Sequence, residues 1–284
     1  MPQSLLLFPA HDFRGTMTAA CFTHFTDTIA ATDVDAIAAA AQIPPAYLLA
    51  QAGPVSVHYT PFDYVNERAR VVVVGITPGF AQWKNAVREA RRMLALGAPA
   101  ADVLRAAKYA GAFSGAIRPN LVALLDHVGL QHWLGIASCA TLWSTDADLM
   151  HVTAALRHAV FVDGKNYNGA SPNMVATPLL QAQMLDHFAQ EAARLPDAVY
   201  VPLGPKVGQA LSWLAQRGVL DEARILHGMP HPSGANAERI AYFLGRKNKA
   251  ALSSRTNGAQ IDADRRALAG RMTALGLQPR TALP

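Results

Sequence analysis

Cysteine is scarce in this chain, and that scarcity excludes several classes of metal protein. The 284 residues contain two cysteines, Cys21 and Cys139. Two thiols cannot complete a four-thiolate zinc or iron–sulfur site, and they do not form a disulfide framework. We therefore expect a protein of a reducing cytoplasm, with no metal and no other cofactor.

Long apolar runs and several familiar motifs are also missing. No run of about 18 apolar residues occurs, and the first ten residues lack the basic region that opens a secretory signal. The dinucleotide glycine pattern, the Walker loop, the G-x-S-x-G elbow and the H-E-x-x-H metal motif are absent as well. These absences argue against a membrane protein and against the common nucleotide-binding and hydrolase classes.

The composition supports a full hydrophobic core and an anionic partner. Apolar residues make up 51% of the chain, so we expect one domain with terminal additions. The net charge is +5 and the isoelectric point is about 9.4. A basic balance of this size favours DNA as a partner, although many basic enzymes share it.

The strongest local pattern is R-V-V-V-V-G-I-T-P-G-F, at residues 70–80. Four consecutive valines predict a strand that is buried on both faces, as in a parallel sheet. Glycine and proline then end the strand. Ligands of open α/β sheets bind beyond the carboxyl ends of the strands, so this loop is a candidate site.

The remaining pattern alternates strands and helices. Buried strands are expected at residues 149–156, 198–204 and 223–228. Helices are expected within 13–52 and 82–111, each broken into two pieces, between the 112–115 loop and Gly129, and at 178–195 and 205–214. This order predicts an α/β fold in which helices flank a central, mostly parallel sheet of four strands. We expect residues 57–248 to form the domain, residues 1–56 a helical extension packed on it, and residues 249–284 a basic helical tail.

Four loops that follow the expected strands carry recognisable motifs. They are G-I-T-P-G at 75–79 with A-F-S-G at 112–115, R-H-A-V-F-V-D-G-K-N-Y-N-G at 157–169, P-L-G-P-K at 202–206, and H-P-S-G-A-N at 231–236. In this order they resemble the motifs of the uracil-DNA glycosylase superfamily, over about residues 57–248. The resemblance implies a three-layer α/β/α fold, a monomeric protein and a DNA substrate that carries uracil.

The resemblance also implies roles for individual residues. It places His231 as a hydrogen-bond donor to the pyrimidine O2, and Phe113 as the ring that stacks on the flipped base, with Phe80 and Trp83 as weaker alternatives. Gly75 and Ile76 would form part of the base pocket. The residues placed against DNA are Pro78, Gly79, Ser233, Gly234, Asn236, Lys206 and Arg157. Ser233 has a simpler reading as a helix cap.

Several positions depart from the family pattern. Thr77 stands where relatives carry Asp or Asn, and its hydroxyl can position a water but not deprotonate it. Asp163 is the candidate carboxylate for stabilising the sugar cation. Ala154 lies near the place of the Asn that reads uracil, so Asn166 or Asn168 is expected to read the base edge, or else to serve only as a turn residue.

The sequence thus predicts a monofunctional uracil-DNA glycosylase of base-excision repair. Two alternatives remain open: a glycosylase for another damaged or deaminated base, and a catalytically silent nucleic-acid binder on the same fold. Thr77 favours the silent binder, whereas Phe113 and His231 favour an enzyme.

Overall fold

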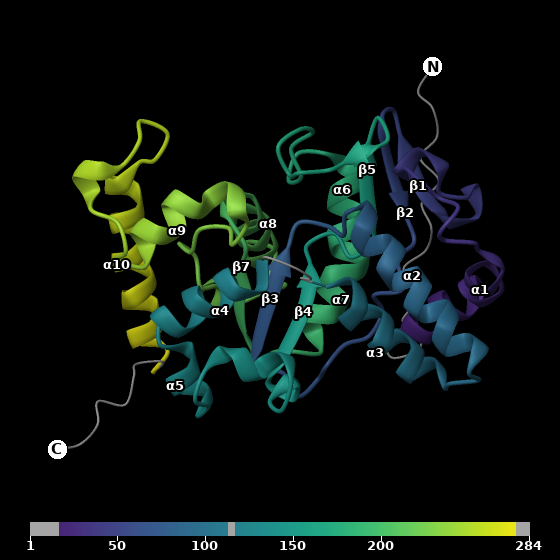
Figure 1. Cartoon of the computed structure of the whole chain (residues 1–284), viewed down its shortest axis with the longest axis horizontal. Helices are drawn as coiled ribbons and strands as arrows, with labels where there is room; N and C mark the ends of the chain where they lie inside the picture. The colour runs from purple at the N-terminus through teal and green to yellow at the C-terminus, as the bar shows by residue number, and fades with distance from the viewer. Residues whose placement is uncertain (1–16, 113–116, 277–284) are drawn as a thin grey trace.

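The computed structural model describes residues 17–112 and 117–276 and shows a mixed α/β chain with two β-sheets (Figure 1). The central sheet is parallel, with the strand order β4-β3-β7. These strands are β3 (Val71–Gly75), β4 (Met150–Ala154) and β7 (Val199–Pro202). The valines of β3 are buried on alternate faces of the sheet, in two separate core clusters. The prediction of a strand buried on both faces is confirmed.

The expected fourth parallel strand is reduced to one bridge. Ile225 pairs with Tyr200 in a parallel bridge, and the Leu226 N–H donates to the Tyr200 carbonyl at 2.8 Å. A 3-10 turn over Glu222–Arg224 precedes the bridge, and the Asp221 side chain caps it by accepting the Ala223 N–H at 2.9 Å. This local capping takes the first half of residues 223–228 out of the extended conformation, so the sheet has three full strands.

A second sheet, antiparallel, was not expected. Its strand order is β1-β2-β5-β6, with β1 (Leu48–Ala52), β2 (Val55–His58), β5 (Ala159–Val162) and β6 (Lys165–Asn166). The helical prediction for residues 13–52 is therefore wrong at its end, and the predicted loop at 157–169 is largely a hairpin. Pairing of β2 with β5 joins segments about a hundred residues apart, which no local pattern reveals.

The helices agree better with the sequence pattern. Their bounds are α1 (Met17–Ala31), α2 (Phe80–Ala95), α3 (Ala100–Gly111), α4 (Ile117–His127), α5 (Leu130–Leu134), α6 (Pro178–Gln183), α7 (Ala189–Ala193), α8 (Pro205–Ala215), α9 (Ala237–Phe243) and α10 (Gly258–Ala274). A π-helical turn, Met184–Phe188, joins α6 to α7. Gly129 ends the α4 segment with φ of 83°, as a left-handed cap should. Across the described ranges, no helix is long and apolar enough to cross a membrane.

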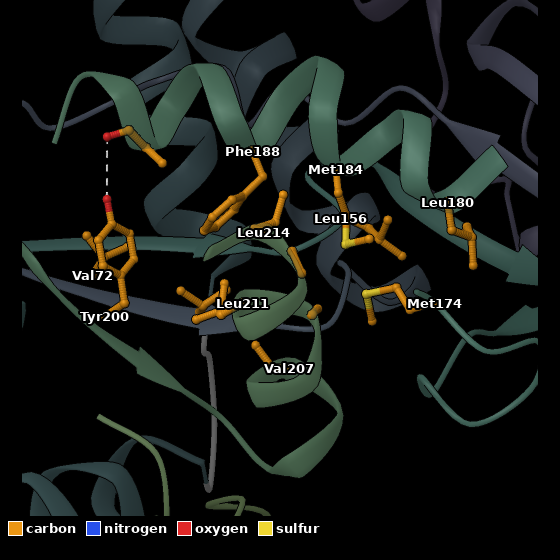
Figure 2. Packing of buried hydrophobic residues seen from close by; sticks show 14 of the residues in the cluster. Val72, Leu156, Met174, Leu180, Met184, Phe188, Tyr200, Val207, Leu211 and Leu214 are labelled. Carbon is orange, nitrogen blue, oxygen red and sulfur yellow. Dashed lines mark hydrogen bonds between the residues drawn. The ribbon is translucent and has the colours of Figure 1, made fainter. Parts of the chain in front are cut away.

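Helices cover both faces of the parallel sheet. Figure 2 shows Phe188, from the helix over one face, pointing toward Leu214 of α8, and Leu180, from the same helix, lying above Met174. The opposite face packs on α4, α5, α9 and α10. In Figure 1, α2 and α3 lie beside the antiparallel sheet, whereas α9 and α10 stand at the other end of the molecule.

A buried ion cluster lies between the two sheets. The Glu191 carboxylate of α7 contacts Lys108 Nζ at 3.4 Å and Arg157 at 3.1 Å, and it accepts a very short hydrogen bond from His151. His151 Nδ1 accepts the Asn66 N–H, so its Nε2 carries the proton that it donates to Glu191. All of these side chains are buried. Lys108 of α3 is thus a core residue although it carries a charge.

Loss of Glu191 should destabilise the fold severely. Glu191→Ala leaves Lys108 as a buried cation without a carboxylate partner, and leaves Arg157 with Asp63 alone at 3.7 Å; breaking a buried pair in this way typically costs about 3–5 kcal/mol. The matched control is Glu67→Ala, which removes an exposed ion pair with Arg194 and should cost about 0–1 kcal/mol. Urea unfolding of both variants checks this, and equal midpoints would contradict it.

The buried histidines should make stability fall with decreasing pH. Burial lowers the pKa of His151 and of His187 to about 4, from the ordinary 6.5. Between pH 6.5 and 4 the unfolded chain binds protons that the folded chain does not, so the free energy of unfolding decreases as the pH falls. Urea midpoints from pH 7 to 4 should show this slope. His187→Gln should reduce the slope, and the exposed control His132→Gln should not; a slope that neither variant changes would contradict the assignment.

Candidate active site

A small cavity opens where β3 and β4 end. Its volume is about 140 Å³, below the roughly 300–1,000 Å³ of pockets that enclose drug-sized ligands, so it suits a single ring. The predicted site residues that line it are Gly75, Ile76, Thr77, Pro78 and His231. The structure thus brings the G-I-T-P-G loop, at residues 75–79, together with His231, the first residue of H-P-S-G-A-N, although the two motifs lie far apart in the sequence.

His231 is held by three separate parts of the chain. Its Nδ1 accepts the Ser233 backbone N–H at 3.2 Å, and its side chain packs on Gly204. Asn120 of α4 donates its side-chain N–H to the Pro232 carbonyl at 2.9 Å and so anchors the loop. Gly204 has φ of 91°, and a Cβ there would lie 3.4 Å from the His231 Cβ.

These contacts define the protonation state of His231. Burial lowers the pKa of His231 below the ordinary 6.5, so the ring is neutral at pH 7. Since Nδ1 accepts a hydrogen bond, the single ring proton belongs on Nε2. His231 therefore presents a neutral N–H donor at the wall of the cavity.

Thr77 lines the cavity, but its hydroxyl has a structural role. The Thr77 Oγ1 donates to the His158 carbonyl at 2.8 Å and accepts the Val160 N–H at 3.1 Å. The hydroxyl proton of Thr77 is therefore used in the hydrogen bond to the His158 carbonyl, in the segment that leads into β5. One lone pair of Oγ1 is left, and it can accept a hydrogen bond from a water, so the role of Thr77 in positioning a water stays a prediction.

Asp163 is not at the cavity. It lies in the hairpin turn between β5 and β6 with φ of 49°, and its backbone N–H donates to the Pro54 carbonyl at 3.0 Å. It is absent from the cavity wall. The predicted role in stabilising a sugar cation is therefore wrong, because the hairpin carries Asp163 to the edge of the antiparallel sheet. Among the described residues that line the cavity, no carboxylate is present.

The two asparagines have local roles. The Asn166 Oδ1 accepts the Phe80 N–H at 2.8 Å, at the N-terminus of α2, and the side chain packs against Gly79. The Asn168 Oδ1 accepts the Ala170 N–H at 3.0 Å, as in an Asx turn. Neither lines the cavity, so the alternative reading as turn and cap residues describes them better than base reading does.

Arg157 does not face a DNA strand. It is 3% exposed and pairs with Glu191 and, at 3.7 Å, with Asp63. Its predicted phosphate contact is therefore wrong, because the buried carboxylates bind its guanidinium inside the protein. Phe113, predicted to stack on the base, lies outside the described residues. Trp83 is fully buried and donates its ring N–H to the Tyr59 carbonyl, so it is unavailable for stacking.

The other predicted DNA contacts are at least partly accessible, with the exception of Pro78. Ser233 sits at the cap position of a 3-10 turn, Gly234–Asn236, and its Oγ accepts the Asn236 side-chain N–H at 3.1 Å. Gly234 and Lys206 are exposed, and Lys206 lies at the start of α8. The Gly79 N–H is taken by the Gln82 side chain at 2.8 Å. Pro78 is buried on the cavity wall.

Sequence reasoning missed several residues of the cavity, among them Thr153, Phe62 and Tyr167. Thr153, next to the predicted Ala154, has a buried Oγ1 with no hydrogen-bond partner. Phe62 and Tyr167 supply aromatic rings to the wall. The sequence contained a signal for Thr153: apolar and polar residues alternate along M-H-V-T-A of β4, and Thr153 is the last polar residue of that strand. No signal marked Phe62, which reaches the cavity from an irregular segment.

Metal chemistry has no evident site here. Within residues 17–112 and 117–276, no group of three or more His, Cys, Asp or Glu side chains is arranged to hold a metal ion. Cys139, the described cysteine, is buried, and burial raises the pKa of its thiol.

The tautomer of His231 can be measured directly. We expect two-dimensional ¹H–¹⁵N spectra of the imidazole to show a neutral ring with the proton on Nε2 at pH 7, and a pKa below 6.5. Asn120→Ala should loosen the loop and move this pKa toward 6.5, because the ring becomes more exposed. A ring protonated on Nδ1 would contradict the assignment.

Comparison with known proteins gives one informative relative. The chain is 33% identical over 218 residues to the uncharacterized protein YoxB of Bacillus subtilis (strain 168). The match spans 76% of this chain and 85% of YoxB. No protein-family model matches the chain, and no solved structure matches it significantly.

Proposed function

Because the chain belongs to the family of Bacillus subtilis YoxB, whose name assigns no activity, we propose its function from the site itself. The protein is proposed to be a monofunctional DNA glycosylase that hydrolyses the N-glycosidic bond of a flipped pyrimidine, uracil first of all. The proposal rests on the resemblance of G-I-T-P-G and H-P-S-G-A-N to the uracil-DNA glycosylase motifs and on the cavity that they share. We further propose that the protein acts in base-excision repair in the cytoplasm.

One observation carries the proposal: His231 offers a neutral N–H donor at a ring-sized cavity. When the glycosidic bond breaks, the pyrimidine takes the electron pair, and negative charge develops on its O2. A preorganised donor aimed at that oxygen stabilises the transition state more than the ground state. A neutral imidazole suits this role because it can donate without first losing solvation of a charge.

The fold supports the proposal at the level of strand order. With the Ile225 bridge counted as a reduced fourth strand, the parallel order becomes β4-β3-β7-Ile225. We propose that this sheet, with helices on both faces, is a uracil-DNA glycosylase-like three-layer core. The antiparallel sheet is then an addition of this family at the β4 edge.

Thr153 is the proposed reader of the base edge. Its Oγ1 is buried without a partner, and an unsatisfied buried hydroxyl typically costs about 1–3 kcal/mol. A hydroxyl can both donate and accept, so the edge of a bound pyrimidine would satisfy it. Phe62 and Tyr167 supply apolar and aromatic surface around the ring.

A second candidate is a catalytically silent member that binds a flipped base or a nucleic-acid strand. It is favoured by two features of the described cavity: no carboxylate lines it, and the Thr77 hydroxyl is engaged with the β5 segment. A glycosylase for a base other than uracil is the remaining possibility, since the proposed reader is a hydroxyl rather than an amide.

Release of free base tests the proposal. Purified protein is incubated with single-stranded and duplex oligonucleotides that carry one uracil, or one of a panel of damaged pyrimidines, and free base is quantified. We expect release from at least one substrate, a loss of about 10²–10³ in rate for His231→Ala, and a smaller loss with changed base preference for Thr153→Val. His132→Ala, on an exposed part of α5, is the matched control.

The outcomes separate the candidates. Release of a damaged base but not of uracil would support the proposed glycosylase reaction and would show that the substrate is a base other than uracil. No release from any substrate, together with binding of the same oligonucleotides, would support the silent binder. A His231→Ala variant with full activity would overturn the catalytic role of His231.

A further inference from the structure

A large groove continues outward from the candidate site. It has a volume of about 1210 Å³, above the range of roughly 300–1,000 Å³ that is typical for pockets of small ligands. Its walls are α8, the 230–236 segment and α10. His231 lines both the groove and the small cavity, so the two share a wall. This arrangement suits a polymer with one unit inserted in the cavity.

Two arginines with no carboxylate partner lie at the H-P-S-G-A-N end of the groove. Arg239 donates to the Asn236 Oδ1 at 2.8 Å and to the Arg255 carbonyl at 3.2 Å. Both Arg239 and Arg255 are exposed. In the part of the chain that the structure describes, no carboxylate lies within ion-pairing distance of either guanidinium, and the Arg255 side chain makes no hydrogen bond to a described residue.

The loop that carries Arg255 is held firmly by Glu238. The Glu238 carboxylate accepts hydrogen bonds from Lys247, from the Ser253 N–H and hydroxyl, and from the Thr256 hydroxyl. These donors hold the pKa of Glu238 well below its usual value, so the carboxylate stays charged. The path of this loop is therefore fixed, and the loop places Arg255 on the groove wall together with Asn236.

Among the described residues, two carboxylates line the groove, Glu222 and Asp264. Glu222 is ion-paired with Arg271 at 3.5 Å, whereas Asp264 accepts the side-chain N–H of the neutral Gln260 at 2.9 Å and keeps its negative charge. The positive charge of the H-P-S-G-A-N end of the groove comes from the guanidinium groups of Arg239 and Arg255, which are unpaired with any described carboxylate. Guanidinium groups in this position match the geometry of phosphate oxygens.

We infer that this groove binds the phosphodiester backbone of the DNA strand that presents the base, and that the C-terminal arm, residues 246–276, contributes to the binding surface through Arg255 on the groove wall. The inference rests on the proposed function for its choice of DNA. The arm lies almost wholly beyond residues 57–248, the part of the chain that resembles the glycosylases, so the resemblance does not include the contact proposed for Arg255. Arg239 and Arg255 would bind phosphates flanking the inserted nucleotide.

Salt-dependent DNA binding tests the inference without requiring catalysis. Anisotropy titrations of a labelled single-stranded oligonucleotide without damage, at several salt concentrations, compare the parent with Arg255→Ala, with Arg239→Ala/Arg255→Ala and with Arg266→Ala. Arg266 is an exposed arginine of α10 outside the groove. We expect the double variant to bind about tenfold more weakly, with a salt slope lower by about 0.7 for each lost phosphate contact, and Arg266→Ala to match the parent.

Failure of the inference and failure of the proposed function look different. If the protein releases base and the groove variants bind DNA and turn over substrate like the parent, the groove inference is overturned and the function stands. If no base is released but the DNA affinity and the salt slope fall only in the groove variants, the groove is confirmed as a DNA-binding surface and the proposed glycosylase activity is wrong. Thermal midpoints equal to the parent's show that the variants are folded. Equal losses in Arg266→Ala would also overturn the inference, because the effect would then reflect net charge alone.

Discussion

The rest of the structure depends on one buried carboxylate. Glu191 binds Lys108 of α3, His151 of β4 and Arg157 of the segment after β4, all out of contact with water. A charge removed from water is tolerated only when its partners are all in place. The cluster therefore permits one arrangement of α3, α7 and the parallel sheet. Few other contacts in the protein impose so strict a condition on elements so far apart in the sequence.

The same cluster defines the junction of the two sheets. After β4 the chain passes through Arg157 and His158 and enters β5 of the antiparallel sheet within a few residues. The Thr77 hydroxyl bonds to both the His158 carbonyl and the Val160 N–H across this junction. The loop after β3 is thereby tied to the neighbouring sheet, and the cavity beside it is narrow because both of its sides are fixed.

The orientation of His231 is a second product of distant contacts. Ser233 fixes its tautomer, Gly204 provides room for its side chain, and Asn120 anchors the following proline carbonyl. These residues belong to the H-P-S loop itself, to the turn after β7 and to α4. A donor held from three directions is preorganised, and it loses little entropy when a ligand arrives. This rigidity is the physical basis of the proposed catalytic role.

The sequence by itself determined the elements whose stability is local. The run of valines, the proline that opens α6 and the glycine that ends the α4 segment predicted their elements, because periodicity, backbone restriction and left-handed dihedrals act within a few residues. The pairing of the G-I-T-P-G loop with His231 also followed from the sequence, since parallel strands end at one edge of a sheet.

Only the tertiary structure decided the rest. Whether Arg157 contacts a phosphate or a buried carboxylate depends on Glu191 of α7, which lies 34 residues further along the chain. Whether Asp163 reaches the site depends on the pairing of β5 with β2, which turns it to the sheet edge. Such choices are made by long-range pairing and burial, whose energies depend on partners that a local pattern does not contain.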